Sequence, residues 1–406
     1  MLVKKVASSS GGNPTKPAEV AKQIKSLLVE LPDIRADAAR LDELRRVFAR
    51  LVTAGELTLN GPNQANPQSS VSARWSAFLH KSHKAMVSQL CERVRLGRHA
   101  SIRCLWGVIA GSPKSLTRKT SNKKEAPSLS YKYLNADLLQ KWIWAMTLQE
   151  SVEMDKGMRH MIESELLSPY RDAQYFSLTA ITKLATSVYE GDYDYEIDKT
   201  KNEAHDEESI DKKKKLVAEK LLELLIMIPV PHSDEELESG NQFLFPPPMY
   251  IASGDGILME NGDTNDDSED DSEDSDSDDE SSEDESSNRD QVVVRPKKRQ
   301  KKESSHKFAF QQIRMFRREY KKAWLAVLRL PLPLASLKKA LHILPHSVLN
   351  YVAQPLRFAD FFMQAYSDHG SGIIGILALD GLFLLITKCK NFYRVSRLPW
   401  PAIFMS

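Results

Sequence analysis

The glycine-rich run GSGIIG contains Gly370, Gly372 and Gly375 and has the spacing of a dinucleotide-binding loop. In that chemistry a strand leads into the loop, and the loop delivers a pyrophosphate to a helix N-terminus. Here the preceding residues 361–366 have a helical pattern, and no acidic residue follows Asp380 to hold a ribose. We therefore predict a turn between two closely packed helices. A nucleotide-dependent enzyme built on this loop is the alternative.

Two histidine pairs have spacings that can place both imidazoles on one helix face, namely His80 with His83 and His342 with His346. No nearby cysteine or carboxylate completes a ligand set, and Pro345 interrupts the second pair. We expect ordinary surface histidines. The three cysteines lie in apolar surroundings typical of small core residues. The sequence therefore predicts no catalytic residue, no metal site, no cofactor and no small-molecule substrate.

An acidic segment from Glu260 to Glu285 contains 16 Asp and Glu residues and no Lys or Arg. The whole chain has a net charge of +1, so the rest of it carries +17. Such a segment cannot bury enough apolar surface to offset its ordering entropy, and we predict disorder across residues 251–307. Its acid-flanked serines are candidate phosphorylation sites: Ser268, Ser272, Ser275, Ser277, Ser281 and Ser282. The alternative is a solubilising linker whose sequence matters little.

A basic run, RPKKRQKK, occupies residues 295–302 within the same region. Its cations predict a nuclear localisation signal: Arg295, Lys297, Lys298, Arg299, Lys301 and Lys302. The alternative is a solvated charge run that no import receptor binds. Residues 1–20 lack the apolar core of a signal peptide and are predicted to form a disordered lead-in.

The longest apolar stretch, Ile373 to Thr387, is shorter than the roughly 20 residues that cross a bilayer. It also holds Asp380 and Gly381, which a membrane span disfavours. We therefore predict a buried core helix there and no contact with a membrane.

Apolar residues recur at three- and four-residue spacing along most of the chain, which predicts amphipathic helices. In residues 36–52, for example, Leu41, Leu44, Phe48 and Leu51 share one face. The other predicted helices cover residues 21–31, 75–94, 99–110, 135–149, 156–167, 171–189, 212–228, 308–328, 334–344, 355–366 and 375–388. Strict period-two alternation is almost absent, and the polar residues 114–127 are predicted to form a loop.

Many helices joined by Gly and Pro breaks predict an all-α fold, a HEAT-like α-solenoid of degenerate repeats with a long disordered acidic insert. A plain multi-helix bundle is the alternative. The expected organisation is an N-terminal helical-repeat region over residues 21–250 and the insert over 251–307. A C-terminal helical domain over 308–390 and a divergent tail over 391–406 follow.

Clusters of basic residues outside the localisation run could neutralise RNA phosphates without reading a base sequence. The clusters are Arg93, Arg95, Arg98 and Arg103; Lys114, Arg118, Lys119, Lys123 and Lys124; Lys212 to Lys215; and Arg314, Arg317, Arg318, Lys321 and Lys322. The alternative, which explains most of them, is a set of ordinary solvated helix faces.

The stretch from Phe316 to Lys390 resembles the conserved domain of the CCAAT-box-binding-factor/Mak family. The resemblance rests on an Ala-Trp-Leu motif at 323–325, a Leu-Pro-Leu-Pro break at 330–333, Pro355 with Ala-Asp-Phe at 359–361, and the run 372–382. Residues 75–107 and 156–184 are also similar to the family. The candidate partner-binding or family-motif residues are Trp324, Pro331, Pro333, Pro355, Asp360, Phe361 and Gly372.

The resemblance implies a non-enzymatic nucleolar scaffold of the small-subunit processome, needed for 40S pre-ribosome assembly and 18S rRNA maturation. It implies nucleolar protein 14 as a heterodimer partner. It also implies association with the pre-40S particle and its pre-rRNA, directly or through that partner. The alternative is a nuclear DNA-associated or transcription-related adaptor, suggested by the family's historical name and the basic surface.

One segment departs from the family pattern. The family continues beyond Lys390 into further helices, whereas Arg394 to Ser406 reads RVSRLPWPAIFMS. We therefore expect an incomplete C-terminal domain. A solenoid without its terminal cap exposes apolar surface, which puts the stability and the heterodimer formation of this chain in question.

Overall fold

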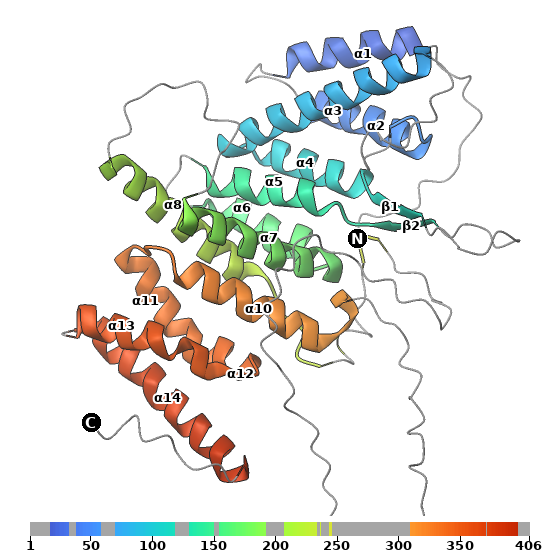
Figure 1. Ribbon diagram of the computed structural model, residues 1–406. Helices are drawn as coiled ribbons and strands as arrows, with labels where there is room; N and C mark the ends of the chain where they lie inside the picture. Colours follow the sequence, from blue (N-terminus) through green and yellow to red (C-terminus); the bar gives the residue numbers. More distant parts are fainter. Residues whose placement is uncertain are drawn as a thin grey trace, which may run out of the picture. The chain divides into compact units, whose positions relative to one another are not determined.

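The computed structural model describes residues 17–31, 38–57, 70–117, 130–149, 154–191, 207–233, 236, 243–245, 309–370 and 372–396. Most of these residues are helical, which confirms the predicted all-α class (Figure 1). The N-terminal helices are α1 (Pro17–Glu30), α2 (Ala38–Thr53), α3 (Ser70–Arg95), α4 (His99–Gly111), α5 (Ala136–Thr147), α6 (Lys156–His160), the π-helical turn η2 (Met161–Leu167), α7 (Arg171–Glu190) and α8 (Glu207–Met227).

The C-terminal part begins with a short 3-10 helix and ends with the longest helix of this part. Its elements are η3 (Ala309–Gln311), α10 (Ile313–Leu328), α11 (Leu334–Ile343), the π-helical turn η4 (Leu344–Val348), α12 (Leu349–Tyr351), the 3-10 helix η5 (Pro355–Phe358), α13 (Ala359–His369) and α14 (Ile373–Ser396). No helix in the described residues has both the length and the apolar character needed to cross a membrane.

The helices stack in the order of the chain. Helix α2 packs on α4, α3 on α4 and α5, and α5 on α7. Helix α10 packs on α7 and α8 although the predicted insert separates them in sequence, and α7 and α10 lie side by side in Figure 1. Stacking of successive helices is the architecture of an α-solenoid, as the sequence predicts. Residues up to Pro247 and from Phe308 onward belong to one compact unit.

Apolar helix faces and aromatic pairs build the interior. In α2 the predicted stripe that includes Leu41 and Phe48 is buried. Trp106 of α4 meets Trp142 of α5 with ring centroids 5.2 Å apart. Tyr175 of α7 meets Phe316 of α10 at 5.8 Å. Burial of large aromatic side chains contributes strongly to stability, so these pairs fix each helix on its neighbour.

A buried carboxylate ties a short segment to α7. Asp172 accepts hydrogen bonds from the backbone amides of Ala173 at 3.0 Å, Leu244 at 3.0 Å and Phe245 at 3.1 Å. Burial raises the pKa of this carboxyl above its ordinary value, while the backbone donors act in the opposite direction. The contacts with Leu244 and Phe245 hold residues 243–245 against the first turn of α7.

The predicted loop over residues 114–127 is wrong at its start. Strand β1 (Lys114–Thr117) pairs antiparallel with β2 (Ser130–Tyr133), and Lys114 lies opposite Tyr133. Segment β1 reads KSLT and has no alternating apolar residues, whereas β2 reads SYKY and alternates polar residues with tyrosine over the shortest length that can indicate a strand. The end of α4 and the start of α5 bring the two segments together instead. At that start Asn135 caps α5, because its side-chain oxygen accepts a hydrogen bond from the Leu138 amide at 3.4 Å.

Candidate partner-binding surface

Helices α13 and α14 form an antiparallel hairpin around the glycine-rich run. Gly372 has φ of 112°, a conformation that favours glycine. A Cβ at Gly375 would lie 2.6 Å from the carbonyl oxygen of Gly370. The turn therefore also requires a glycine at position 375. The element before the run is helix α13 rather than a strand. The predicted helix-to-helix turn is therefore confirmed, and the dinucleotide loop geometry is not formed.

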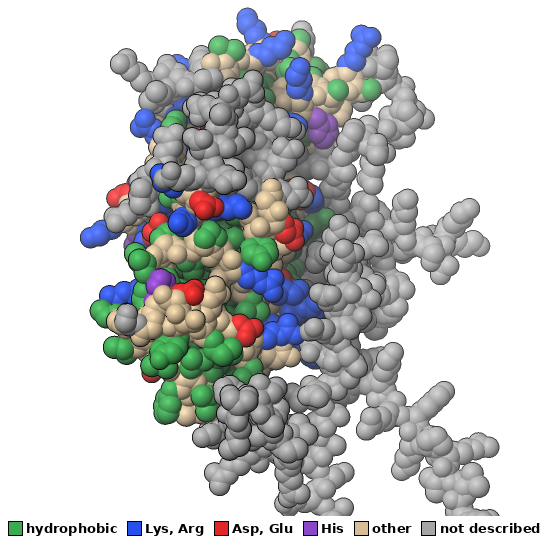
Figure 2. Space-filling model, turned by 60° about the vertical axis from the view of Figure 1, so that its left-hand side comes forward, with side chains coloured by type: hydrophobic (Ala, Val, Ile, Leu, Met, Phe, Trp, Pro, Cys, Tyr) green, Lys and Arg blue, Asp and Glu red, His purple; other side chains and the backbone are tan. Residues whose placement is uncertain are grey.

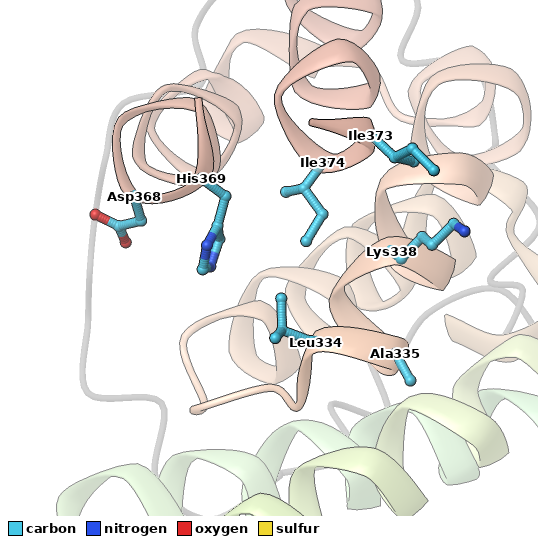
Figure 3. A pocket seen from close by; sticks show the side chains of 7 residues that line it. All are labelled: Leu334, Ala335, Lys338, Asp368, His369, Ile373 and Ile374. Atoms are coloured by element: carbon cyan, nitrogen blue, oxygen red, sulfur yellow. The ribbon is translucent and has the colours of Figure 1, made fainter. Parts of the chain in front are cut away.

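A pocket of about 520 Å³ opens beside this turn, between α11, α13 and α14. Its lining residues are Leu334, Ala335, Lys338, Asp368, His369, Ile373 and Ile374. Figure 3 shows that Leu334, His369 and Ile374 point toward one another, whereas the carboxylate of Asp368 points away. The pocket is thus an open depression lined by apolar and charged side chains, of which Leu334 and Ile373 are 61% and 59% exposed. That combination suits the insertion of an apolar side chain from a partner protein.

Helix α14 departs from the predicted buried core helix. One face packs on α13 and α11 and includes the buried residues Ala378 and Leu385. The opposite face is exposed, with Ile376 at 67% and Phe383 at 64% of full exposure. Hydrophobic side chains gather over the C-terminal helices in Figure 2. The prediction failed because an all-round apolar sequence cannot reveal that its helix is the last in the described stack.

The predicted family-motif residues are spread over several environments. Trp324 is fully buried in α10 and contacts Tyr320 at 6.1 Å between ring centroids, so it stabilises the interior. Pro331 is exposed, and Pro333 directly precedes α11. Pro355 opens η5. These residues shape the path of the chain between helices and do not form one cluster.

Three further motif residues belong to the α13–α14 hairpin. Asp360 is exposed in the first turn of α13, and half-buried Phe361 contacts Phe362 at 5.8 Å between ring centroids. Gly372 lies at the other end of α13, within the turn. Only Gly372 adjoins the pocket lining. The prediction missed the pocket residues, because they come from three helices and have no shared sequence motif.

Several predicted RNA-binding cations instead hold the fold together. Arg93 is buried and donates from Nη1 to the Leu31 carbonyl at 2.8 Å and from Nε to the Ser101 hydroxyl at 3.1 Å. Arg95 pairs with a glutamate on its own helix. Arg103 pairs with Glu165 at 2.9 Å. Buried Arg93 therefore fits neither RNA binding nor the alternative of a solvated helix face, whereas Arg103 lies on an exposed face.

In the basic cluster on α10, some residues have contacts within the protein and others are exposed. Arg317 donates to the His232 carbonyl at 3.2 Å and lies over the Tyr351 ring, 5.2 Å from its centroid. Lys321 donates to Gln354 at 2.8 Å, and Lys322 pairs with the nearby Glu319. Arg314 and Arg318 are exposed, as are Lys212, Lys213 and Lys215 on α8. These exposed cations, together with the exposed Arg98 before α4, can meet phosphate, although Lys212 and Lys213 also have interactions within the protein.

The first histidine pair differs from the prediction of surface histidines. His83 is buried against Phe48, with ring centroids 5.5 Å apart. Burial lowers the pKa of His83 to about 4, and the neighbouring His80 and Lys141 add to this effect. In the second pair His346 is exposed and its Nε2 lies 3.8 Å from Asp380 Oδ2. No group of three potential metal ligands occurs among the residues that the structure describes.

The remaining predicted sites cannot be located in the fold. The six candidate phosphorylation sites and the six cations of the localisation run lie outside the described residues. The same holds for the basic residues Arg118, Lys119, Lys123 and Lys124. These sites therefore remain sequence predictions.

Stacked helices with an apolar surface at one end define a helical-repeat protein with a surface suited to macromolecular interaction. No family model matches the sequence. The chain is similar to the "Nucleolar complex protein 4 homolog" of Rattus norvegicus, with 37% identity over 107 residues, which is 25% of this chain and 20% of that protein. It is 42% identical over 82 residues to the homolog of Homo sapiens, covering 19% of this chain and 16% of the relative.

A plant protein gives a similar match. "Protein NUCLEOLAR COMPLEX ASSOCIATED 4" of Arabidopsis thaliana is 32% identical over 93 residues, which is 22% of this chain and 16% of the relative. The chain thus spans about a fifth or less of the length of these relatives. All three are named as nucleolar complex proteins, and none of the names denotes an enzyme.

Proposed function

We propose that this chain is a non-enzymatic nucleolar ribosome-biogenesis factor. Its role would be that of a scaffold in 40S pre-ribosome assembly and 18S rRNA maturation. The observation that carries the proposal is the similarity to nucleolar complex proteins from animals and a plant. The helical-repeat fold supports it, because stacked helices offer extended surfaces for holding other macromolecules.

The proposed protein partner is nucleolar protein 14, docked on the C-terminal helices. The open pocket beside the α13–α14 turn supports this placement, because Leu334 and Ile374 offer apolar surface to a partner. Lys338 stands at its rim and could pair with a carboxylate of the partner. Binding energy at protein interfaces is concentrated in a few apolar anchors that fill such pockets.

Pre-rRNA contact is proposed for the exposed cations of α8 and α10. Arg314 and Arg318 lie one helical turn apart on α10, so both can reach the same stretch of RNA backbone. Neutralising phosphates gives affinity without base recognition and makes binding sensitive to salt. The proposed contact therefore contributes affinity for the pre-ribosomal particle and does not recognise a particular RNA sequence.

Affinity purification of the full chain from cells tests the partner and the particle together. We expect nucleolar protein 14 and pre-rRNA in the eluate of the unchanged chain. Leu334→Asp combined with Lys338→Glu should lower recovery of the partner at least about tenfold, the cost of losing roughly 1.4 kcal/mol of binding. The matched control is Val29→Asp, which alters an exposed residue of α1. Equal recovery with both variants would place the partner elsewhere.

Depletion of the protein separates the proposed role from that of a nuclear DNA-associated adaptor. We expect 18S rRNA precursors to accumulate and mature 18S rRNA to fall, with rescue by the unchanged chain. Normal 18S maturation after complete depletion would contradict a role in 40S assembly.

A further inference from the structure

Two aromatic side chains of α3 lie stacked at the protein surface, in a region that the proposed function does not use. The rings of Trp75 and Phe78 have centroids 5.6 Å apart and are only 18° from parallel. The two interior pairs described above are inclined by 58° and 63° instead. Both side chains are half-buried, so part of each ring remains open to solvent. A near-parallel pair is an arrangement onto which a further flat ring can stack.

Contacts from two other parts of the chain hold this aromatic pair in place. The indole N–H of Trp75 donates a hydrogen bond to Glu56 Oε2 at 3.1 Å, and this contact is exposed. The Lys25 Nζ of α1 lies 5.7 Å from the centroid of the Phe78 ring, which is a cation–π distance. The two rings are therefore preorganised, and little further ordering is needed when a ligand binds them.

Exposed cations surround the aromatic pair. Arg74 and Lys81 are exposed on α3, and their spacing of four and three residues from Phe78 places all three on one side of the helix. Lys22 is exposed on α1, one turn before Lys25. None of Lys22, Arg74 and Lys81 forms an ion pair with another residue that the structure describes, in contrast to Arg103. These three cations are therefore free to meet an anionic ligand.

The charge of the N-terminal helices favours a polyanion. Helices α1, α2 and α3 together contain 11 Lys and Arg residues against 5 Asp and Glu residues. Residues 70–91, which include both rings, contain no Asp or Glu. Lys and Arg side chains gather over these helices in Figure 2. An excess of one sign of charge raises the local concentration of ligands of the opposite sign.

Flat rings beside cations match the two parts of a nucleotide. An unpaired base offers a flat face to an aromatic side chain, and its phosphates pair with Lys and Arg. The bases of a duplex are already stacked on each other, so they cannot use the rings in this way. A protein ligand fits less well, because lysine is depleted in protein–protein interfaces. The chemistry therefore favours a single nucleic-acid strand.

We propose that Trp75 and Phe78 form a stacking platform for an unpaired base of single-stranded nucleic acid. Lys22, Arg74 and Lys81 bind the phosphates that flank this base. The site goes beyond the proposed contact at α8 and α10, because stacking adds affinity that phosphate pairing alone does not supply. It recognises unpaired strands without selecting a base sequence, since every base has a flat face.

Fluorescence anisotropy with the full chain and a labelled oligouridylate of about 12 nucleotides tests the stacking. Trp75→Leu keeps an apolar side chain without the ring, and should weaken binding about 5- to 100-fold at an unchanged salt dependence. Trp75→Phe restores a ring without the hydrogen bond to Glu56, and should recover most of the affinity. Equal affinity of Trp75→Leu and the unchanged chain overturns the proposal. Equal losses in the two variants overturn it as well.

Charge variants test the phosphate contacts. Lys22→Gln combined with Lys81→Gln should make the slope of log affinity against log salt less steep by about 1.4, at about 0.7 for each phosphate of a single strand. The matched control is Lys156→Gln combined with Lys183→Gln, which removes the same charge from exposed lysines of α6 and α7. An equal change of slope in both double variants overturns the proposal.

The carboxylate beside the rings gives a test in the opposite direction. Glu56→Gln keeps an acceptor for the Trp75 N–H but removes a negative charge. We expect binding of the oligouridylate to strengthen by about two- to fivefold, the usual size of an exposed charge interaction. A weaker complex would contradict a phosphate path next to the aromatic pair.

Other ligands separate this site from a general basic surface. Duplex RNA of the same length should bind more weakly than the oligouridylate, and an oligoglutamate peptide of the same charge should compete poorly. Equal binding of either one overturns the proposal. Oligodeoxythymidylate shows whether RNA or DNA is the source of the strand, because it offers the same rings and phosphates. No test here needs a partner or a pre-ribosome, so a negative result leaves the proposed function standing.

Discussion

Gly381 of α14 lies directly against the ring of Phe362 of α13. A Cβ at Gly381 would collide with that ring. The backbone of one helix therefore packs on an aromatic side chain of the other, and this contact sets the separation of the hairpin. The hairpin in turn positions the pocket at its turn and the exposed apolar side chains of α14 on its outer face.

The first prediction is that Gly381→Ala destabilises the protein by about 1 to 3 kcal/mol, the usual cost of overpacking a well-packed contact. Urea unfolding followed by circular dichroism would measure it. In a Phe362→Ala background the same substitution should cost much less, because the clashing ring is gone. An equal cost in both backgrounds would mean that the contact with Phe362 is not the cause.

The second prediction concerns pH. The pKa of His83 is about 4 in the folded protein against 6.5 for an ordinary histidine. Between these values the unfolded chain binds a proton that the folded protein does not. Stability from this residue is therefore present above pH 6.5 and is lost as the pH falls toward 4, by about 3 kcal/mol in all.

Urea unfolding at several pH values checks this dependence. His83→Leu should flatten the curve between pH 4 and 6.5. The control Phe48→Leu alters the neighbouring ring, which lies 5.5 Å from His83 between centroids, and should lower stability while keeping the slope. A His83→Leu curve as steep as that of the unchanged protein would refute the assignment.

The third prediction separates structural cations from RNA-binding ones. Arg93→Ala should cost about 3 kcal/mol, because it removes a buried charged donor from Leu31 and Ser101. Arg95→Ala, on the same helix, should cost less than about 1 kcal/mol, since it breaks an ion pair with a half-exposed glutamate. Thermal unfolding would compare them, and similar losses would contradict the structural role of Arg93.

The fourth prediction tests nuclear import. Lys297→Ala, Lys298→Ala and Arg299→Ala together should reduce nuclear accumulation of a fluorescent fusion, because import receptors bind clustered cations. The control changes the flanking Lys301 and Lys302, which should have a smaller effect. Unchanged localisation of the triple variant would show that another signal or the partner drives import.

The fifth prediction tests the acidic segment. Deleting residues 260–285 should leave the helical signal in circular dichroism intact, because a segment this rich in charge adds no core. The deletion changes the net charge from +1 to +17, so binding of the purified chain to RNA should strengthen at low salt. A large loss of helicity would show that the segment supports the fold.

Periodicity was sufficient to predict most of the helices. The buried face of α2 follows the apolar pattern closely, because an isolated amphipathic stripe has one way to be buried. In α7, by contrast, the seven consecutive residues Asp172 to Leu178 are all buried, polar ones included. Start positions were less accurate. Helix α1 begins at Pro17, ahead of the predicted start at residue 21, since proline suits the first turn of a helix.

Tertiary context decided what the sequence could not. The β1–β2 pairing depends on two helices that bring together segments too short to be predicted as strands. The burial of Arg93 and His83 depends on neighbours contributed by other helices. The pocket also draws its lining from α11, α13 and α14. No local sequence pattern indicates such contacts between residues that are distant in the chain.

The π-helical turns η2 and η4 have a consequence for tracing ancestry. Helix η4 inserts a wider turn at Leu344–Val348, between α11 and α12, and η2 at Met161–Leu167 ends the helix that α6 begins. Residues after the wide turn are rotated out of phase with those before it. If repeated units of the chain each acquired such an insertion, they would no longer share one length. A search for repeats at a fixed sequence period would then fail, even where the backbones of the units superimpose.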